Sequence, residues 1–174
     1  MSDHLSQKEL ESHLWGAATL LRGLIDASDY KQYIFPLLFF KRLSDVWEEE
    51  YTAAFEETQD EGYATATAND RFNIPEGAQW KDAREASSDV GRALLGAFQT
   101  IEMANPERLK GVFGSAAWTD KAQMPDETLK NLIEHFSKHT LSLANVPEDE
   151  LGNGYEYLIK QFADDSGHTA QEFY

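Results

Sequence analysis

Apolar residues recur at spacings of three and four along most of the chain, a pattern that predicts α-helices rather than strands. The first stripe follows Ser6 and Glu9, whose spacing is that of a capping box at a helix start. The apolar positions of this stripe are Leu10, Leu14, Ala17, Leu21 and Leu24. We therefore expect a first helix that carries this stripe up to a break at Asp26–Asp29.

A second helix is predicted over about Tyr30–Glu57. Pro36 lies within it, and because proline lacks an amide donor and clashes with the preceding turn, we expect a kink or a helix start near Pro36. The least regular stretch is Asp60–Gln79, where Asn73 and Pro75 favour an extended or turn segment.

Helices are predicted again in the second half of the chain, several of them opened by a proline at the first helical position. The expected elements are Trp80–Ala86, Val90–Met103, a helix start at Asn105–Arg108, Pro125–Thr140, a last helix from Pro147, and a turn at Asp164–Gly167. No stretch alternates convincingly between apolar and polar residues, as a half-buried strand would. The pattern predicts an all-α fold, a compact multi-helix bundle with no substantial sheet.

The size and composition fit one globular domain. With 174 residues and 41% hydrophobic content, the chain can bury a core without disulfides, and it contains no cysteine. The N-terminus lacks the basic flank and apolar core of a signal peptide, and the longest apolar run, Tyr33–Phe40, is too short to span a bilayer. We expect a cytoplasmic protein with no membrane contact.

The charge is strongly negative, with 31 acidic and 15 basic residues and a net charge of −16. Eight carboxylates and no lysine or arginine occur between Asp45 and Glu61. This run can be a solvated helix face, a docking surface for a basic partner, or a mimic of the charge of DNA. Because affinity for DNA depends on lysine and arginine at phosphates, tight DNA binding by the chain alone is not expected.

Two short patterns are candidates for a nucleotide-binding turn and for a metal site. Gly152-Asn153-Gly154 lies in a helical pattern without a preceding strand, so it favours close approach of another element over a nucleotide cradle. His135 and His139 would share one helix face, but Phe136 stands where a zinc protease has glutamate. We expect no metal site and no catalytic residue in this chain.

The segment Tyr33–Trp47 is apolar on more than one helix face, which predicts a central helix packed on two sides. Lys41 and Arg42 interrupt it as the one adjacent basic pair in the sequence. The favoured interpretation places their stems along the core and their heads toward water or Asp45. The alternative makes Lys41 and Arg42 contacts to DNA or to an acidic partner.

The last residues, Glu172-Phe173-Tyr174, put two aromatic rings at the end of the sequence. Aromatic side chains bury large apolar areas, and natural termini are usually polar. We therefore expect that this sequence continues in a longer protein, against which these rings pack.

Several stretches together resemble one known family. They are Leu14–Leu24, then Tyr30–Tyr51 with Phe39-Phe40-Lys41-Arg42-Leu43-Ser44-Asp45, then Arg71-Phe72-Asn73-Ile74-Pro75, Leu151–Ile159 and Glu172–Tyr174. In this order they are similar to the N-terminal helical domain of the methylation (M, HsdM) subunit of type I restriction-modification systems. The resemblance covers nearly the whole chain.

This resemblance implies a domain of a site-specific adenine-N6 DNA methyltransferase. In the family, Glu-Phe-Tyr precedes a Rossmann-like domain that binds S-adenosylmethionine and carries an Asn-Pro-Pro-Tyr/Phe motif, which this chain lacks. By resemblance, Glu172, Phe173 and Tyr174 form part of the cofactor-bordering segment. Residues 1–166 would be the helical domain and residues 167–174 the start of the link to the catalytic domain, with no cofactor expected for this chain alone.

The resemblance also implies partners: a specificity (S) subunit, a second M subunit, a restriction (R) subunit, and duplex DNA in the assembled complex. A methyltransferase that acts on a base in a duplex must flip that base out, which a helical clamp can assist. The isolated domain could self-associate through its bare subunit surface. The alternatives are a stand-alone acidic interaction protein, such as a DNA mimic, and a helical metal-dependent hydrolase using His135 and His139.

Overall fold

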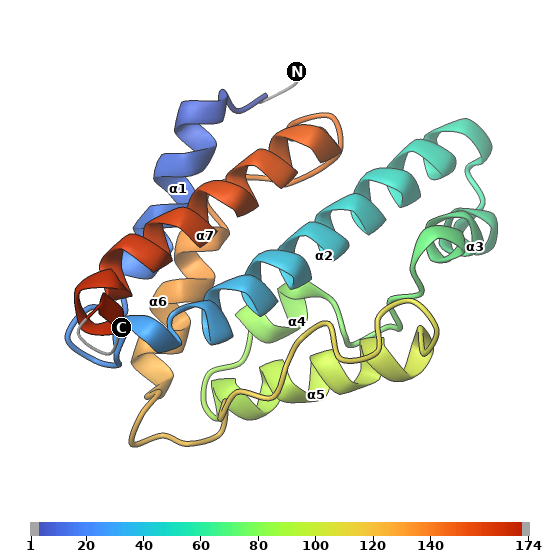
Figure 1. Cartoon of the computed structure of the whole chain (residues 1–174). Helices are drawn as coiled ribbons and strands as arrows, with labels where there is room; N and C mark the ends of the chain where they lie inside the picture. Colours follow the sequence, from blue (N-terminus) through green and yellow to red (C-terminus); the bar gives the residue numbers. More distant parts are fainter. Residues whose placement is uncertain (1–3, 172–174) are drawn as a thin grey trace.

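The computed structural model describes the backbone of residues 4–171 and the side chains of residues 4–164 (Figure 1). All regular secondary structure among these residues is helical. The elements are α1 (Gln7–Thr19), η1 (Ala27–Asp29), α2 (Lys31–Thr58), α3 (Glu61–Arg71), α4 (Trp80–Arg84), α5 (Val90–Ala104), α6 (Asp126–Phe136) and α7 (Glu148–Gln171). No strand occurs among these residues. The predicted all-α fold is therefore confirmed.

The first helix begins at the predicted capping box. The Glu9 amide donates to Ser6 Oγ and the Ser6 amide donates to Glu9 Oε1, each at 3.1 Å. The predicted stripe is buried except for its last member, Leu24, which is 51% exposed. That part of the prediction was wrong because α1 already ends at Thr19, and the chain then turns through Gly23, whose φ is +79°.

Helix α2 lies in the middle of the molecule, as its apolar pattern predicted (Figure 1). Elements α3, α4, α6 and η1 all pack against it. The helix begins at Lys31 and continues through Pro36, so Pro36 does not start it. Burial of Pro36 and its apolar neighbours provides hydrophobic stabilisation that offsets the missing amide hydrogen bond.

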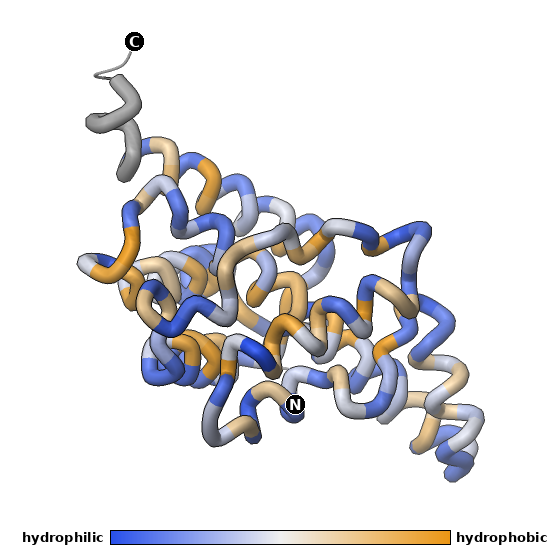
Figure 2. The backbone as a smooth tube through the Cα atoms, turned by 90° about the horizontal axis from the view of Figure 1, so that it is seen from below, coloured by the Kyte–Doolittle hydropathy of each residue, from blue (hydrophilic) through white to orange (hydrophobic). Residues whose placement is uncertain are grey.

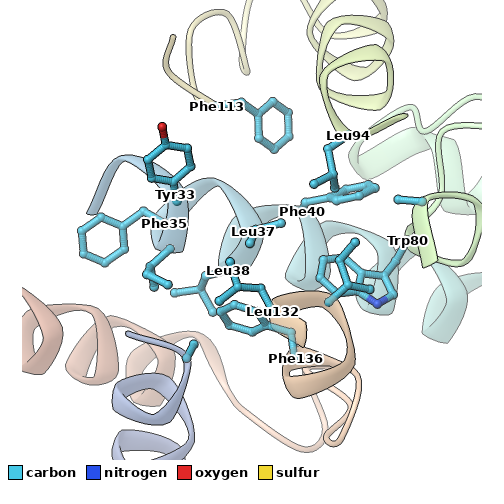
Figure 3. Packing of buried hydrophobic residues seen from close by; sticks show 14 of the residues in the cluster. Tyr33, Phe35, Leu37, Leu38, Phe40, Trp80, Leu94, Phe113, Leu132 and Phe136 are labelled. Atoms are coloured by element: carbon cyan, nitrogen blue, oxygen red, sulfur yellow. The ribbon is translucent and has the colours of Figure 1, made fainter. Parts of the chain in front are cut away.

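The core forms where α2 meets α4, α5 and α6, and side chains from these helices point toward one another there (Figure 3). The Phe40 ring lies 5.2 Å from the ring of Trp80 and 5.4 Å from that of Phe98, measured between centroids. Phe98 in turn stacks on Phe113 at 4.4 Å. The apolar stripes predicted for α5 and α6 are buried in this core: Val90, Leu94, Phe98, Ile101, Leu129, Leu132, Ile133 and Phe136. Hydrophobic and hydrophilic residues are interspersed along the coloured helical tubes (Figure 2), as expected for helices with one buried face.

Residues 61–71 form helix α3, where the sequence was expected to be irregular. The Asp60 carboxylate caps this helix by accepting from the Tyr63 amide at 3.1 Å. Ala64 and Ala68 are buried in the contact with α2. Alanine at a spacing of four allows two helices to approach closely but gives only a weak hydrophobic signal. The extended or turn segment expected from Arg71 to Glu76 does follow α3.

Two predicted boundaries were wrong. Asn105 ends α5 instead of opening a helix, and its side chain bonds to the last turn of α5 and to the backbone of the distant Asn73. Asn105 Nδ2 donates to the carbonyls of Asn73 and Ile101 at 2.7 and 2.8 Å, and Asn105 Oδ1 accepts from the Asn73 amide at 2.8 Å. The turn expected at Asp164–Gly167 is also absent, since α7 continues to Gln171.

None of the helices in the described part of the chain combines the length and apolar character needed to cross a membrane.

Candidate functional site

Lys41 points into the protein from the middle of α2. Its side chain is 6% exposed, and its Nζ pairs with the Asp45 carboxylate one turn later. The same ammonium lies 5.9 Å from the centroid of the Trp80 ring. In this position the amine of Lys41 is engaged by groups of the chain itself.

Arg42 binds the loop that precedes α7. Its Nη1 donates to the carbonyls of Leu141 and Ser142, each at 3.0 Å, and to that of Val146 at 2.5 Å. Burial lowers the pKa of Arg42, while the nearby carboxylates, Glu148 first among them, act in the opposite direction. Arg42 thus binds three backbone acceptors of the loop, one of which, the Ser142 carbonyl, also accepts from the Val146 amide at 2.9 Å.

Acidic side chains of α2 hold the same loop from its amide side. Asp45 Oδ2 accepts from the Leu141 amide at 2.7 Å. Glu49 accepts from the amides of Leu143 and Ala144 at 2.8 and 3.1 Å. Together with Arg42, these carboxylates fix residues 141–146 and therefore the start of α7. We call this group of α2 side chains and loop backbone the loop clamp.

A mostly apolar groove of about 390 Å³ opens beside the loop clamp, between α2 and α7. Its walls are Leu38, Phe39, Arg42, Glu148, Leu151, Gly152 and Tyr155. Tyr155 is 37% exposed, and its ring centroid lies 4.5 Å from that of Phe35 and 6.1 Å from that of Phe39. The packed rings give the groove a rigid aromatic floor. Apolar side chains of another protein could bury area here.

The Gly-Asn-Gly stretch lies within α7, and Gly154 is its point of close contact with α1. A Cβ at this position would lie 3.0 Å from Leu14 Cδ1 and 3.1 Å from Leu10 Cδ2. The absence of a side chain therefore lets α7 approach α1, as the sequence predicted for this stretch. Gly152 differs, with no atom within 4 Å of such a Cβ. Within this stretch Gly154, and not Gly152, therefore serves helix packing.

His135 and His139 form a ring cluster with a third histidine, His13 of α1. The rings of His13 and His135 stack at 4.6 Å, and His139 meets the His13 ring edge-on, also at 4.6 Å. His135 Nε2 bonds to the His13 carbonyl at 2.7 Å. No group of side chains suited to hold a metal ion occurs in the described part of the chain.

Sequence reasoning missed His13, although a signal was present. The residue lies between Leu10 and Ala17 on the buried face of α1, and it is only 6% exposed. Its Nε2 is buried without a hydrogen-bond partner. The other candidates from the sequence, Glu172, Phe173 and Tyr174, lie outside the described residues.

Comparisons with known proteins agree on one family. The sequence matches the model of the HsdM N-terminal domain family over residues 10–136. It is 26% identical over 187 residues to the type I restriction enzyme MjaIX methylase subunit of Methanocaldococcus jannaschii, an alignment that covers 95% of this chain and 33% of that protein.

A solved structure gives the same result. The type I restriction-modification system methyltransferase subunit of Streptococcus thermophilus superposes with a TM-score of 0.71 and 27% identity, over 93% of this chain and 40% of that one. This chain thus spans about a third of the curated relative and two fifths of the solved one.

Proposed function

Because this chain belongs to the HsdM N-terminal domain family, we propose that it is the assembly and DNA-clamping domain of a type I restriction-modification methylation subunit. The main support for this proposal is that nearly the whole chain aligns with one part of each of two longer methylase subunits. The same match argues against the alternative of a stand-alone acidic DNA mimic.

The methyl-transfer chemistry belongs, in this proposal, to the rest of a longer subunit that acts on adenine N6 in DNA. S-adenosylmethionine would supply the methyl group there. In the described part of this chain, Gly154 of the one Gly-x-Gly stretch lies inside α7 against Leu10 and Leu14 of α1, which supports a packing role for it. We assign residues 1–166 to the helical domain and residues 167–174, which begin within the last turns of α7, to the start of its link, with Glu172–Tyr174 bordering the cofactor only once the link is complete. The chain alone then has no enzymatic activity.

Protein contacts suit this surface better than direct contacts to phosphates. A net charge of −16 repels DNA at long range, and the basic pair Lys41 and Arg42 is engaged inside the fold. We assign both residues a structural role, Arg42 in the loop clamp and Lys41 as the partner of Asp45. Clamping of the duplex would then come from closure of the assembled specificity, methylation and restriction subunits around DNA.

The groove between α2 and α7 is the surface that we assign to assembly, with apolar side chains of the specificity subunit as its occupant. Its floor exposes aromatic rings already fixed by packing, so binding loses little side-chain entropy. Aromatic side chains in such positions are typical of interface centres.

Tyr155→Glu in the complete methylation subunit tests this assignment, with Met103→Glu as the matched control. Met103 is 80% exposed on α5 and does not line the groove. Native mass spectrometry with the cognate specificity subunit should show assembly weakened at least about tenfold by Tyr155→Glu and unchanged by Met103→Glu. Equal assembly by both variants would contradict the role of the groove.

A further inference from the structure

The second half of α2 packs against α3 (Figure 1). This region lies away from the end of the molecule where α1 and α7 pack. Along this part of α2 a ladder of parallel aromatic rings is formed by Trp47, Tyr51 and Phe55. The Trp47 and Tyr51 rings lie 5.3 Å apart at 11°, and the Tyr51 and Phe55 rings 6.1 Å apart at 4°. Each ring is one helical turn from the next, so all three share one face of α2.

A cleft of about 420 Å³ lies between this helix pair and the segment 74–82. Trp47 and Tyr51 line it from α2, and Ile74 and Pro75 line it from the segment 74–82. The Trp47 indole is held in place because its Nε1 donates to Asn69 Oδ1 at 2.7 Å. The cleft therefore presents aromatic surface in a fixed orientation, and its volume is in the range of ligand sites.

The lining of this cleft is acidic. Glu48, Glu76 and Asp82 contribute carboxylates, against one cation, Lys81. Glu48 and Glu76 are exposed and take part in none of the ion pairs among the described side chains. Nearby Glu50, in contrast, pairs with Arg71 at 2.5 Å. The two free carboxylates and the aromatic wall are available to a ligand cation.

We propose that this cleft binds an arginine side chain from a basic segment of a protein partner. A guanidinium can stack on the face of a fixed aromatic ring while its donors bind carboxylates. Arginine suits this arrangement better than lysine because its cation is planar and more weakly hydrated. A nucleic acid fits poorly, since its phosphates would meet Glu48 and Glu76 and the net charge of −16.

The first test is a nitrogen-15 NMR titration of the chain with the peptide acetyl-Gly-Arg-Gly-Arg-Gly-amide. The Trp47 indole signal should shift, while the indole signals of Trp15, Trp80 and Trp118, which lie outside the cleft, should stay in place. The same peptide with citrulline for arginine is the matched probe, because citrulline keeps the shape without the charge. An unmoved Trp47 signal, or an equal response to citrulline, would overturn the proposal.

Two double variants test the role of the carboxylates. Glu48→Gln with Glu76→Gln removes both free carboxylates of the cleft and should weaken peptide binding about fivefold or more. Glu56→Gln with Glu57→Gln changes the net charge equally at exposed positions of the same helix outside the cleft, and it should change binding by less than about twofold. Equal weakening by the two pairs would mean general charge attraction and would overturn the site.

Tyr51→Leu tests the aromatic wall and should reduce the Trp47 shift and the affinity about threefold. A short single-stranded DNA oligonucleotide that moved the Trp47 signal as much as the arginine peptide would also refute the proposal. The cleft is separate from the α2–α7 groove, so Tyr155→Glu should leave peptide binding unchanged. The experiments can therefore refute the proposal for the cleft without refuting the proposal for the groove, and the reverse.

Discussion

Replacing His13 with phenylalanine should remove much of the sensitivity of this domain to mild acid. Burial lowers the pKa of His13 from its ordinary value of 6.5 to about 3, with His135, His139, Lys138 and Lys41 adding to the effect as cations. The folded protein therefore keeps His13 neutral at pH values where the unfolded chain takes up a proton. A phenylalanine ring would fill the same place and lose no hydrogen bond at Nε2, which has no partner.

The size of this effect follows from the pKa difference. Above about pH 6.5 His13 is neutral in both states and does not make stability depend on pH. Below that value the unfolded state binds the proton, and the free energy of unfolding falls by about 1.4 kcal/mol per pH unit until about pH 3. The full loss is about 5 kcal/mol, of which about 2 kcal/mol is lost between pH 7 and pH 5. Burial also lowers the pKa of His135, so His135 acts in the same direction.

Urea unfolding followed by circular dichroism at pH 8, 7, 6 and 5 measures this loss. The His13→Phe variant should lose about 2 kcal/mol less than the wild type between pH 7 and pH 5. His4→Gln is the matched control, because the His4 side chain is 48% exposed beside Glu150 and lies outside the ring cluster. Parallel pH profiles for the wild type and His13→Phe would refute the reasoning. If His13→Phe were too crowded to fold well, His13→Leu would provide the same comparison.

Three further substitutions, two of them with a control glycine in the same helix, test the packing and the loop clamp through urea unfolding. Arg42→Lys keeps the charge but cannot reach three carbonyls, so the free energy of unfolding should fall by about 3 kcal/mol; a change below about 0.5 kcal/mol would show that the clamp is dispensable. Gly91→Ala would place a Cβ 1.8 Å from a backbone carbonyl oxygen and should cost about 3 kcal/mol or more, whereas Gly96→Ala in the same helix meets nothing and should stabilise by about 0.5–1 kcal/mol. Gly154→Val should cost about 1–3 kcal/mol by separating α7 from α1, and Gly152→Ala should be neutral or stabilising; equal effects would contradict the close approach.

The sequence predicted helices correctly where a helix has one apolar face and its own cap. The capping box at Ser6 and the stripes of α5 and α6 depend on residues three or four apart, so they were readable directly. Helix α3 was missed because its buried residues are the alanines Ala64 and Ala68, whose small side chains contribute little to a hydrophobic pattern. Its stability comes from packing on α2, which the local sequence does not reveal.

The candidate sites depend on contacts between distant parts of the chain, and these could be predicted only in part. The position of Lys41 beside Asp45 is local, at a spacing of four, and the sequence suggested it. The contacts of Arg42 and Glu49 with residues 141–146 join segments about a hundred residues apart, and no local sequence pattern predicts such contacts. The aromatic ladder at a spacing of four on α2 is visible in the sequence, but the cleft beside it exists only because segment 74–82 folds back.

Calorimetric titration with S-adenosylmethionine shows most directly whether this domain contributes contacts to the subunit and no cofactor chemistry. The titration compares this chain with the complete methylation subunit under the same conditions. We expect saturable binding near one equivalent by the complete subunit and no measurable heat from the chain. Stoichiometric binding by the chain at the affinity of the complete subunit would contradict it.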